Sequence, residues 1–138
     1  MSVVNLKGFL YVVVVEARYL PVIGMGEAAI DSLATVFLND MEEGSTPPVF
    51  DTVAPRFDKK FKIKVVGEYT TFNVQLLDGG DSENHLGVAD IELAKVIDGE
   101  AHEMWIKLKE RVGAKTKYPI DNSELHVIVQ YSAYKPRA

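Results

Sequence analysis

Apolar and polar side chains alternate with a period of two over most of this chain of 138 residues. In the clearest case, Lys60, Lys62 and Lys64 alternate with apolar residues, which predicts a strand with one face in water. A different pattern occurs at 9–15 (FLYVVVV), where a nearly continuous β-branched and aromatic run predicts a strand buried on both faces. Further alternating stretches lie at 72–76, 86–93, 105–108 and 125–131.

Clusters of turn-forming residues separate these stretches, among them EEGSTPP, VAPR, DGGDSEN and YPIDNS. Short strands punctuated in this way are typical of an antiparallel sandwich or barrel. We therefore expect an all-β protein, with one short helix near 93–101 that ends around Gly99.

The stretch 27–38 leaves two interpretations open. Ile30, Leu33 and Phe37 have helical spacing, whereas Ala34, Val36 and Leu38 alternate as in a strand. With glycines at 24 and 26 just ahead, a helix here would suggest a dinucleotide-binding turn. The rest of the chain does not alternate helices with strands, so that fold is disfavoured.

Composition is that of an ordinary globular protein, with 47% apolar and 25% charged residues. We expect one domain spanning 1–138 with its core at about 8–133, and no membrane-spanning helix, since no apolar run is long enough. The absence of cysteine excludes a disulfide framework, a thiolate metal site and a cysteine nucleophile. It also fits a reducing compartment and predicts a cytoplasmic protein.

Charge is distributed unevenly along the chain. The net charge of -5 argues against general nucleic-acid binding. Residues 16–46 hold six carboxylates against one arginine, whereas residues 107–117 hold five basic side chains against Glu110 alone. Because local patches decide what a surface attracts, the second segment is a candidate for contact with anions.

Five short phrases occur in a characteristic order. They are LYVVVVEARYLP at 10–21, IDSLA at 30–34, TVAPRFD at 52–58, LD and LG at 77–78 and 86–87, and Trp105 with Leu108. In this order and spacing they resemble the phrases of the C2 domain family. The resemblance implies an eight-stranded antiparallel Greek-key β-sandwich in the type II arrangement, with 33–38 as its second strand.

The resemblance also implies where calcium ligands would stand, namely two aspartates in loop one and three in loop three. Asp31 matches one position of loop one, but Met25 occupies the other. In loop three Asp78 matches the first position, whereas Gly80 occupies the second and Asp81 is displaced by one residue. The loop is also about two residues short, and Asn84 stands nearest the last aspartate.

Two matching carboxylates out of five predict a solvated turn rather than a tight calcium site, because calcium affinity tracks ligand number and charge. The alternative is a weak site built from Asp31, Asp78, Asp81 and Asn84. We expect no other cofactor. An EF-hand does not fit this loop in either of the two possible registers.

Catalysis is not expected. His85, His102 and His126 lie far apart, and no nucleophile elbow or phosphate loop is present, so we predict neither an enzyme nor a small-molecule substrate. His126 alternates with apolar neighbours, which places it on the wet face of its strand.

Membrane docking has more support, because C2 domains dock through the loops at one end. Val22, Ile23 and Met25 are apolar residues in loop one, although they could also fold back over the sandwich. Connections after alternate strands emerge at the same end, which predicts that the segment with Arg111, Lys115 and Lys117 lies beside them. An apolar tip next to cations suits an anionic membrane, with a merely solvated loop as the alternative.

Lys60, Lys62 and Lys64 form a separate basic strand face. The phosphoinositide-binding lysines of the family lie on other strands, so their role is not transferred here. We interpret the face as solvated and unfavourable for edge pairing.

The sequence thus predicts a non-enzymatic C2-type targeting or docking module that binds an anionic membrane or a protein partner without calcium. It would be cytoplasmic, or peripheral on a membrane. The alternatives are weak calcium-dependent phospholipid binding and a purely structural protein-interaction domain of a cytoskeletal or scaffold assembly.

Overall fold

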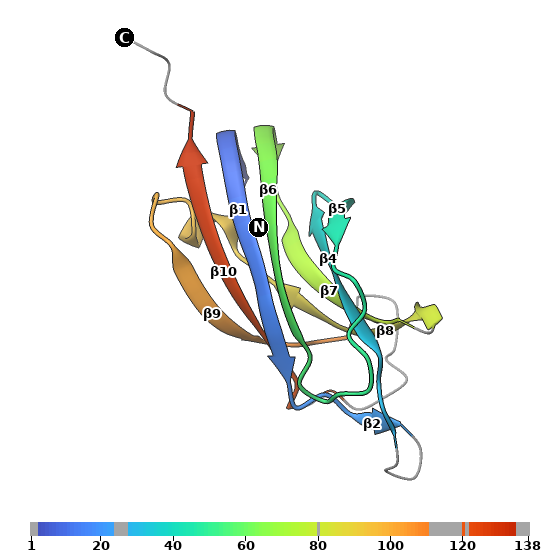
Figure 1. Cartoon of the computed structure of the whole chain (residues 1–138). Helices are drawn as coiled ribbons and strands as arrows, with labels where there is room; N and C mark the ends of the chain where they lie inside the picture. Colours follow the sequence, from blue (N-terminus) through green and yellow to red (C-terminus); the bar gives the residue numbers. More distant parts are fainter. Residues whose placement is uncertain (1–2, 24–27, 80, 111–119, 121, 135–138) are drawn as a thin grey trace.

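Two antiparallel sheets of four strands pack face to face (Figure 1). The computed structural model describes residues 3–23, 28–79, 81–110, 120 and 122–134, with the backbone alone at 22–23, 28–29 and 81–84. The strands are β1 (Val4–Arg18), β2 (Val22–Ile23), β3 (Ala28–Ala29), β4 (Ser32–Leu38), β5 (Met41–Ser45), β6 (Arg56–Tyr69), β7 (Phe72–Asp78), β8 (Asp81–Asp90), β9 (His102–Lys107) and β10 (Glu124–Ala133).

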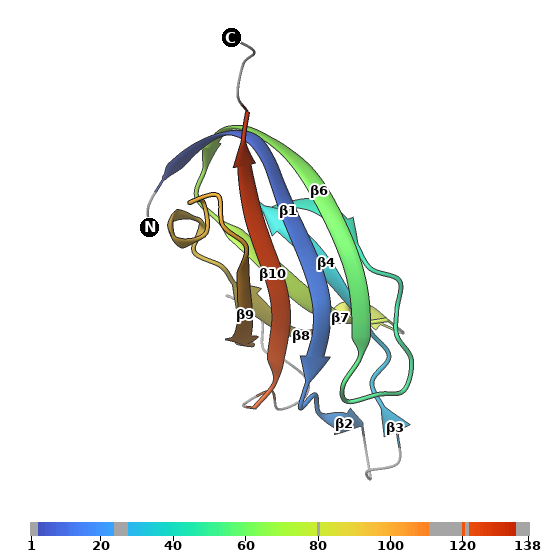
Figure 2. The same ribbon diagram turned by 60° about the vertical axis from the view of Figure 1, so that its left-hand side comes forward.

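Strand order shows how distant parts of the chain come together. The first sheet has the order β6-β1-β10-β9 and the second β5-β4-β7-β8, while β2 and β3 form a small hairpin at one end (Figure 2). β1 pairs with β10, so the first and last strands of the chain are neighbours. The predicted all-β sandwich is confirmed, and the ambiguous stretch at 33–38 is strand β4, which excludes a helix opening there.

The inner faces of the two sheets form a continuous apolar core. Leu10, Val12 and Val14 of β1 are fully buried, as are Val74 and Leu76 of β7 on the opposite sheet. On β6 the predicted alternation is confirmed, since the lysines at 60, 62 and 64 are exposed and the residues between them face the core.

β1 differs from expectation, because its outer face is not covered. Phe9 and Val13 are only partly buried and Tyr11 is 38% exposed, so the predicted burial on both faces is wrong. The run of four valines ends in a bulge between Val14 and Glu16, seen in the pairing with both neighbours. An inserted residue reverses which side chains face outward. This reversal places Glu16 on the outer face.

The short helix expected near 93–101 is reduced to one 3₁₀ turn, η1 (Leu93–Lys95). The following residues belong to a turn that includes Gly99 at φ 89°, a conformation that favours glycine. No helix among the described residues is long and apolar enough to cross a membrane.

Because the outer face of β1 is uncovered, substitutions at two adjacent positions of this strand should lower the free energy of unfolding by very different amounts. Leu10→Ala should lower the free energy of unfolding by about 2–5 kcal/mol, because it leaves a cavity in the core. Tyr11→Thr keeps a β-forming residue on the outer face and should cost less than about 1 kcal/mol. Urea denaturation monitored by tryptophan fluorescence measures both, and equal losses would contradict the one-sided burial of β1.

Candidate functional site

One end of the sandwich gathers the loops that the sequence analysis singled out, and we call it the loop end. Here the last residue of β7, Asp78, pairs with the first residue of β4, Ser32. In the other sheet Arg18, Glu124 and Lys107 form one row across β1, β10 and β9. Lys107, the first basic residue of the 107–117 segment, ends β9 in this row. The paired strands β2 and β3 lie at this end (Figure 2), while Met25, Arg111, Lys115 and Lys117 lie outside the described residues.

Backbone hydrogen bonds hold the segment 46–55 against this end. Val49 and Ser32 exchange two hydrogen bonds of 2.8 and 2.9 Å. The N–H of Ala17 donates to the carbonyl of Pro55, and that of Leu20 donates to the carbonyl of Val53. The segment therefore links the start of β4 to the end of β1.

Asp31 and Asp78 lie at the ends of adjacent strands. The N–H of Gly79 donates to the Asp31 carbonyl at 2.5 Å, which holds the start of loop three beside β4. A carboxylate oxygen of Asp31 accepts the N–H of Asp51 at 2.7 Å. Asp51 has a φ of 51°, in the left-handed region, so this hydrogen bond supports a strained turn. Asp31 thus has a structural use in the 46–55 segment.

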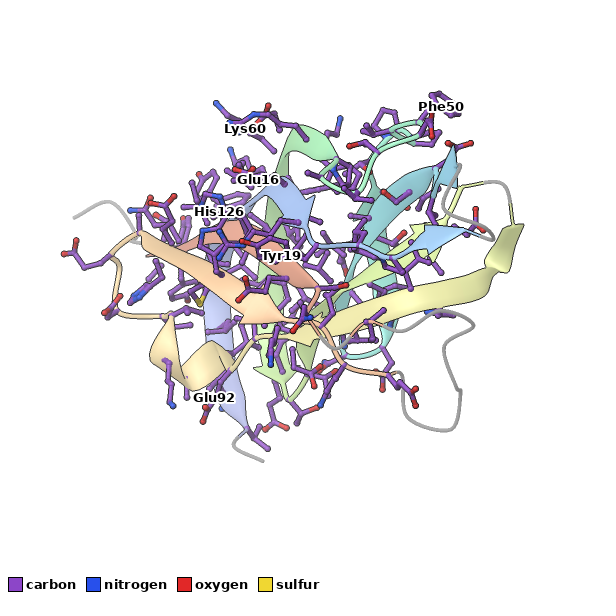
Figure 3. All side chains as sticks on the ribbon, turned by 90° about the horizontal axis from the view of Figure 1, so that it is seen from below. Glu16, Tyr19, Phe50, Lys60, Glu92 and His126 are labelled. Atoms are coloured by element: carbon purple, nitrogen blue, oxygen red, sulfur yellow. The ribbon has the colours of Figure 1, made fainter. Side chains whose placement is uncertain are left out.

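Exposed apolar side chains also occur at the loop end. Tyr19 is 61% exposed, Phe50 68% and Val53 38%. Figure 3 looks onto this end and labels Tyr19 and Phe50, which project at separate points on it. Sequence reasoning missed all three, although an aromatic residue directly after a proline-rich turn, as at position 50, was an available signal.

A polar cluster lies on the outer face of the first sheet next to this end. His126 stacks on Trp105 with ring centroids 4.7 Å apart, and Arg18 lies 3.7 Å from the centre of the same indole ring. The imidazole of His126 is also within hydrogen-bond distance of Glu103 (2.5 Å) and Glu16 (3.3 Å), and Figure 3 shows Glu16 and His126 side by side. His126 therefore faces outward as predicted, and its contacts tie β1, β9 and β10 together.

The other histidines occupy different elements, His85 in β8 and His102 in β9. His102 contacts the carboxylate of Asp98 at 2.7 Å. This hydrogen bond, with another from the backbone N–H of Glu100, holds the pKa of Asp98 below its ordinary value. These contacts lie beyond the start of β9, away from the loop end.

Family comparison decides what kind of domain this architecture represents. The model of the C2 domain matches residues 8–108, well over half of the chain. The chain belongs to the C2 domain family. C2 domains are membrane- or protein-binding modules, and this chain is a module of that class. A search of curated proteins finds no match.

Solved C2 structures share the fold at low sequence identity. The first C2 domain (domain A) of plant Extended Synaptotagmin 1 has 18% identity and a TM-score of 0.75, with coverage of 96% of this chain and 100% of that chain. Calcium-bound Extended Synaptotagmin 2, solved with its C2 domains A and B, has 18% identity and a TM-score of 0.71, with coverage of 94% and 47%. Human GIVD cytosolic phospholipase A2 has 17% identity and a TM-score of 0.70, with coverage of 95% and 17%.

The residues present do not fit the full calcium site of the family. The sequence has a thioether at 25 and no side chain at 80, where the family has carboxylates. Asp31 already supports the Asp51 turn. Among the side chains that the structure describes, no group of three or more histidines, aspartates or glutamates is arranged to hold a metal. Asp81 and Asn84 stay predictions, because only their backbone is described.

The hydrogen bond from Asp51 predicts how Asp31 contributes without metal. Asp31→Ala should lower the free energy of unfolding by about 1 kcal/mol, because the Asp51 N–H loses its acceptor. Asp31→Asn should retain most of that stability, since the amide oxygen can accept the same bond. Urea denaturation in chelator measures both variants. A stabilisation by calcium that is abolished equally by alanine and asparagine would instead show that Asp31 is a metal ligand.

Proposed function

We propose that this C2 domain is a docking module that attaches to anionic membranes through its loop end, without calcium and without catalysis. The observation that carries the proposal is the exposure of Tyr19, Phe50 and Val53 at one end of the sandwich. Apolar side chains that protrude from a loop end can enter the interface of a bilayer, where their burial is favourable. We propose that the domain spans 1–138 and acts in the cytoplasm or at a membrane surface.

The expected binding free energies support an attachment with an apolar part and a charged part. Burying one aromatic side chain such as Phe50 contributes about 1.5–3 kcal/mol. Each lysine or arginine near an anionic surface contributes about 1 kcal/mol. We propose that Arg111, Lys115 and Lys117 supply this second part, and that Val22, Ile23 and Met25 add to the apolar part. Neither part alone gives firm binding, so both would be required.

The proposed calcium independence is supported by the residues that stand at the calcium positions. Met25 and Gly80 remove two carboxylates from the family set, and Asp31 is occupied by the Asp51 turn. A domain whose attraction to phosphate groups comes from fixed cations needs no bridging metal. Weak calcium binding by Asp31, Asp78, Asp81 and Asn84 is the alternative, and so is attachment of the loop end to a protein.

Phe50 offers a direct test by liposome sedimentation, in calcium or in chelator. Wild type should pellet with vesicles that contain anionic lipid, equally in both conditions, and not with neutral vesicles. Phe50→Ser should weaken partitioning at least about tenfold, because it removes the most exposed apolar side chain that the structure describes at the loop end.

Met41→Ser is the matched control, because Met41 is 69% exposed but lies in the β4–β5 hairpin, beyond the opposite end of β4. It should bind vesicles as wild type does. Pelleting that requires calcium would contradict the proposed independence. Equal losses for both variants would contradict docking by the loop end, and no pelleting under any condition would favour a structural role.

A further inference from the structure

Charged side chains on the outer face of the first sheet separate into two halves. In the half next to the loop end, carboxylates are paired: Glu124 with Arg18 at 2.8 Å, and Glu16 with Arg56 at 3.2 Å. Glu16 also contacts His126, and Arg56 also pairs with Asp58 at 2.8 Å. This half of the face is therefore largely neutralised within the molecule.

The other half carries four lysines and no ion pair among the described residues. Lys60, Lys62 and Lys64 project from β6, and Lys7 projects from the neighbouring strand β1. Two of them, Lys62 and Lys7, have aromatic partners instead. The Lys62 ammonium lies 4.5 Å from the centre of the Phe9 ring and 5.9 Å from that of Tyr11. We call this surface the lysine–aromatic face, made up of Lys7, Phe9, Tyr11, Lys60, Lys62 and Lys64.

A shallow apolar groove of about 380 Å³ lies at the end of this face away from the loops. Phe9, Val66 and Tyr134 contribute its apolar surface, and both Val66 and Tyr134 are 59% exposed. Lys7 and Lys64 stand at its rim, with the Lys7 ammonium 5.5 Å from the centre of the Tyr134 ring. An apolar side chain of a partner could fill this groove while the lysines hold charged neighbours.

We propose that the lysine–aromatic face binds an extended acidic segment of a partner protein, laid along β6 on the outer surface of the sheet. Alternate residues of a strand are ~6.8 Å apart, so Lys60, Lys62 and Lys64 present ammonium groups at that interval. An extended peptide with acidic residues at every second position presents carboxylates at the same interval. Val66 continues the series, so the matching segment has an apolar residue two positions beyond its third carboxylate.

The shape of the surface favours such a segment over a bilayer. Lys62 lies across the rings of Phe9 and Tyr11, so the aromatic groups form a platform between the strands and do not protrude as an inserting tip. The outer face of the other sheet has a groove of about 410 Å³ whose lining includes Asp40, Asp90 and Glu110, against Lys109, which pairs with Asp90. Acidic lining repels an acidic segment, so charge complementarity assigns it to the lysine–aromatic face.

This inference goes beyond membrane docking and uses a different surface. The β6 lysines lie on the sheet face, whereas Phe50 lies at the loop end, so each function can fail while the other persists. A C2 domain with both surfaces would bring an acidic protein segment to the membrane on which it docks.

Fluorescence anisotropy with a defined peptide tests the proposal on the whole chain. The probe is a labelled seven-residue peptide with glutamate at positions one, three and five, threonine between them and phenylalanine last. Wild type should bind it, and Lys60→Glu combined with Lys64→Glu should weaken binding at least about tenfold, since exposed ion pairs are converted to repulsion. Val66→Ser should weaken binding several-fold through the apolar groove alone.

Two controls separate this site from general electrostatics. Lys95→Glu makes the same charge change as Lys60→Glu alone, at an exposed position off the lysine–aromatic face, and should bind within about twofold of wild type, whereas Lys60→Glu alone should weaken binding several-fold. A scrambled peptide with its three glutamates adjacent should bind several-fold more weakly than the alternating one.

Three results would overturn the proposal. They are no binding of the alternating peptide by wild type, equal losses for Lys60→Glu and Lys95→Glu, and equal affinity for the scrambled peptide. Liposome sedimentation of the same variants gives a fourth. If Lys60→Glu with Lys64→Glu abolishes pelleting on anionic vesicles while peptide binding is absent, this face is a membrane surface instead.

Discussion

The pairing of β1 with both β6 and β10 is the constraint on which the rest of this C2 domain depends. β1 joins the middle of the chain to its end, because its neighbours are separated from it by about 50 and 120 residues of sequence. Its inner face places Leu10, Val12 and Val14 against the second sheet, so strand pairing and core formation occur together. Without β1, strand β6 would not be joined to β10, and the first sheet would not form as one unit.

The bulge between Val14 and Glu16 then divides the outer face of that sheet. Before the bulge the outward residues are Phe9, Tyr11 and Val13, which lie beside the lysines of β6. After it, Glu16 faces outward and meets Arg56 and His126. One inserted residue therefore separates two surfaces. On one side lie aromatic residues and lysines that have no ion pair among the described residues. On the other side the charges neutralise one another.

Family membership settles the architecture of this chain but not its ligands. At 16–18% identity the solved neighbours share the β-sandwich, and a shared fold carries different sites. Here the loop-end residue Asp31 supports a turn through Asp51, a use that needs no metal.

Local pattern predicted much of this domain, and the physical reason is the two-residue period of a strand. The alternation at 57–65 determined that the lysines of β6 face water, and the order of five phrases indicated the family before any pairing was known. The type II arrangement and the calcium and membrane residues stay predictions. The proline-rich turn before Phe50 was a sequence signal for a loop, but the exposure of Phe50 depends on how 46–55 packs against the ends of β1 and β4.

By itself, then, the sequence determined which strands form and which face of most of them is apolar, since both follow from neighbours within a few residues. Only the tertiary structure decided that the outer face of β1 stays uncovered, because a run such as FLYVVVV has the same appearance whether or not another layer packs on it. It also decided which charges are paired. The partners Glu16, Arg56 and His126 come from three strands far apart in the chain, and only the register of the sheet brings them together.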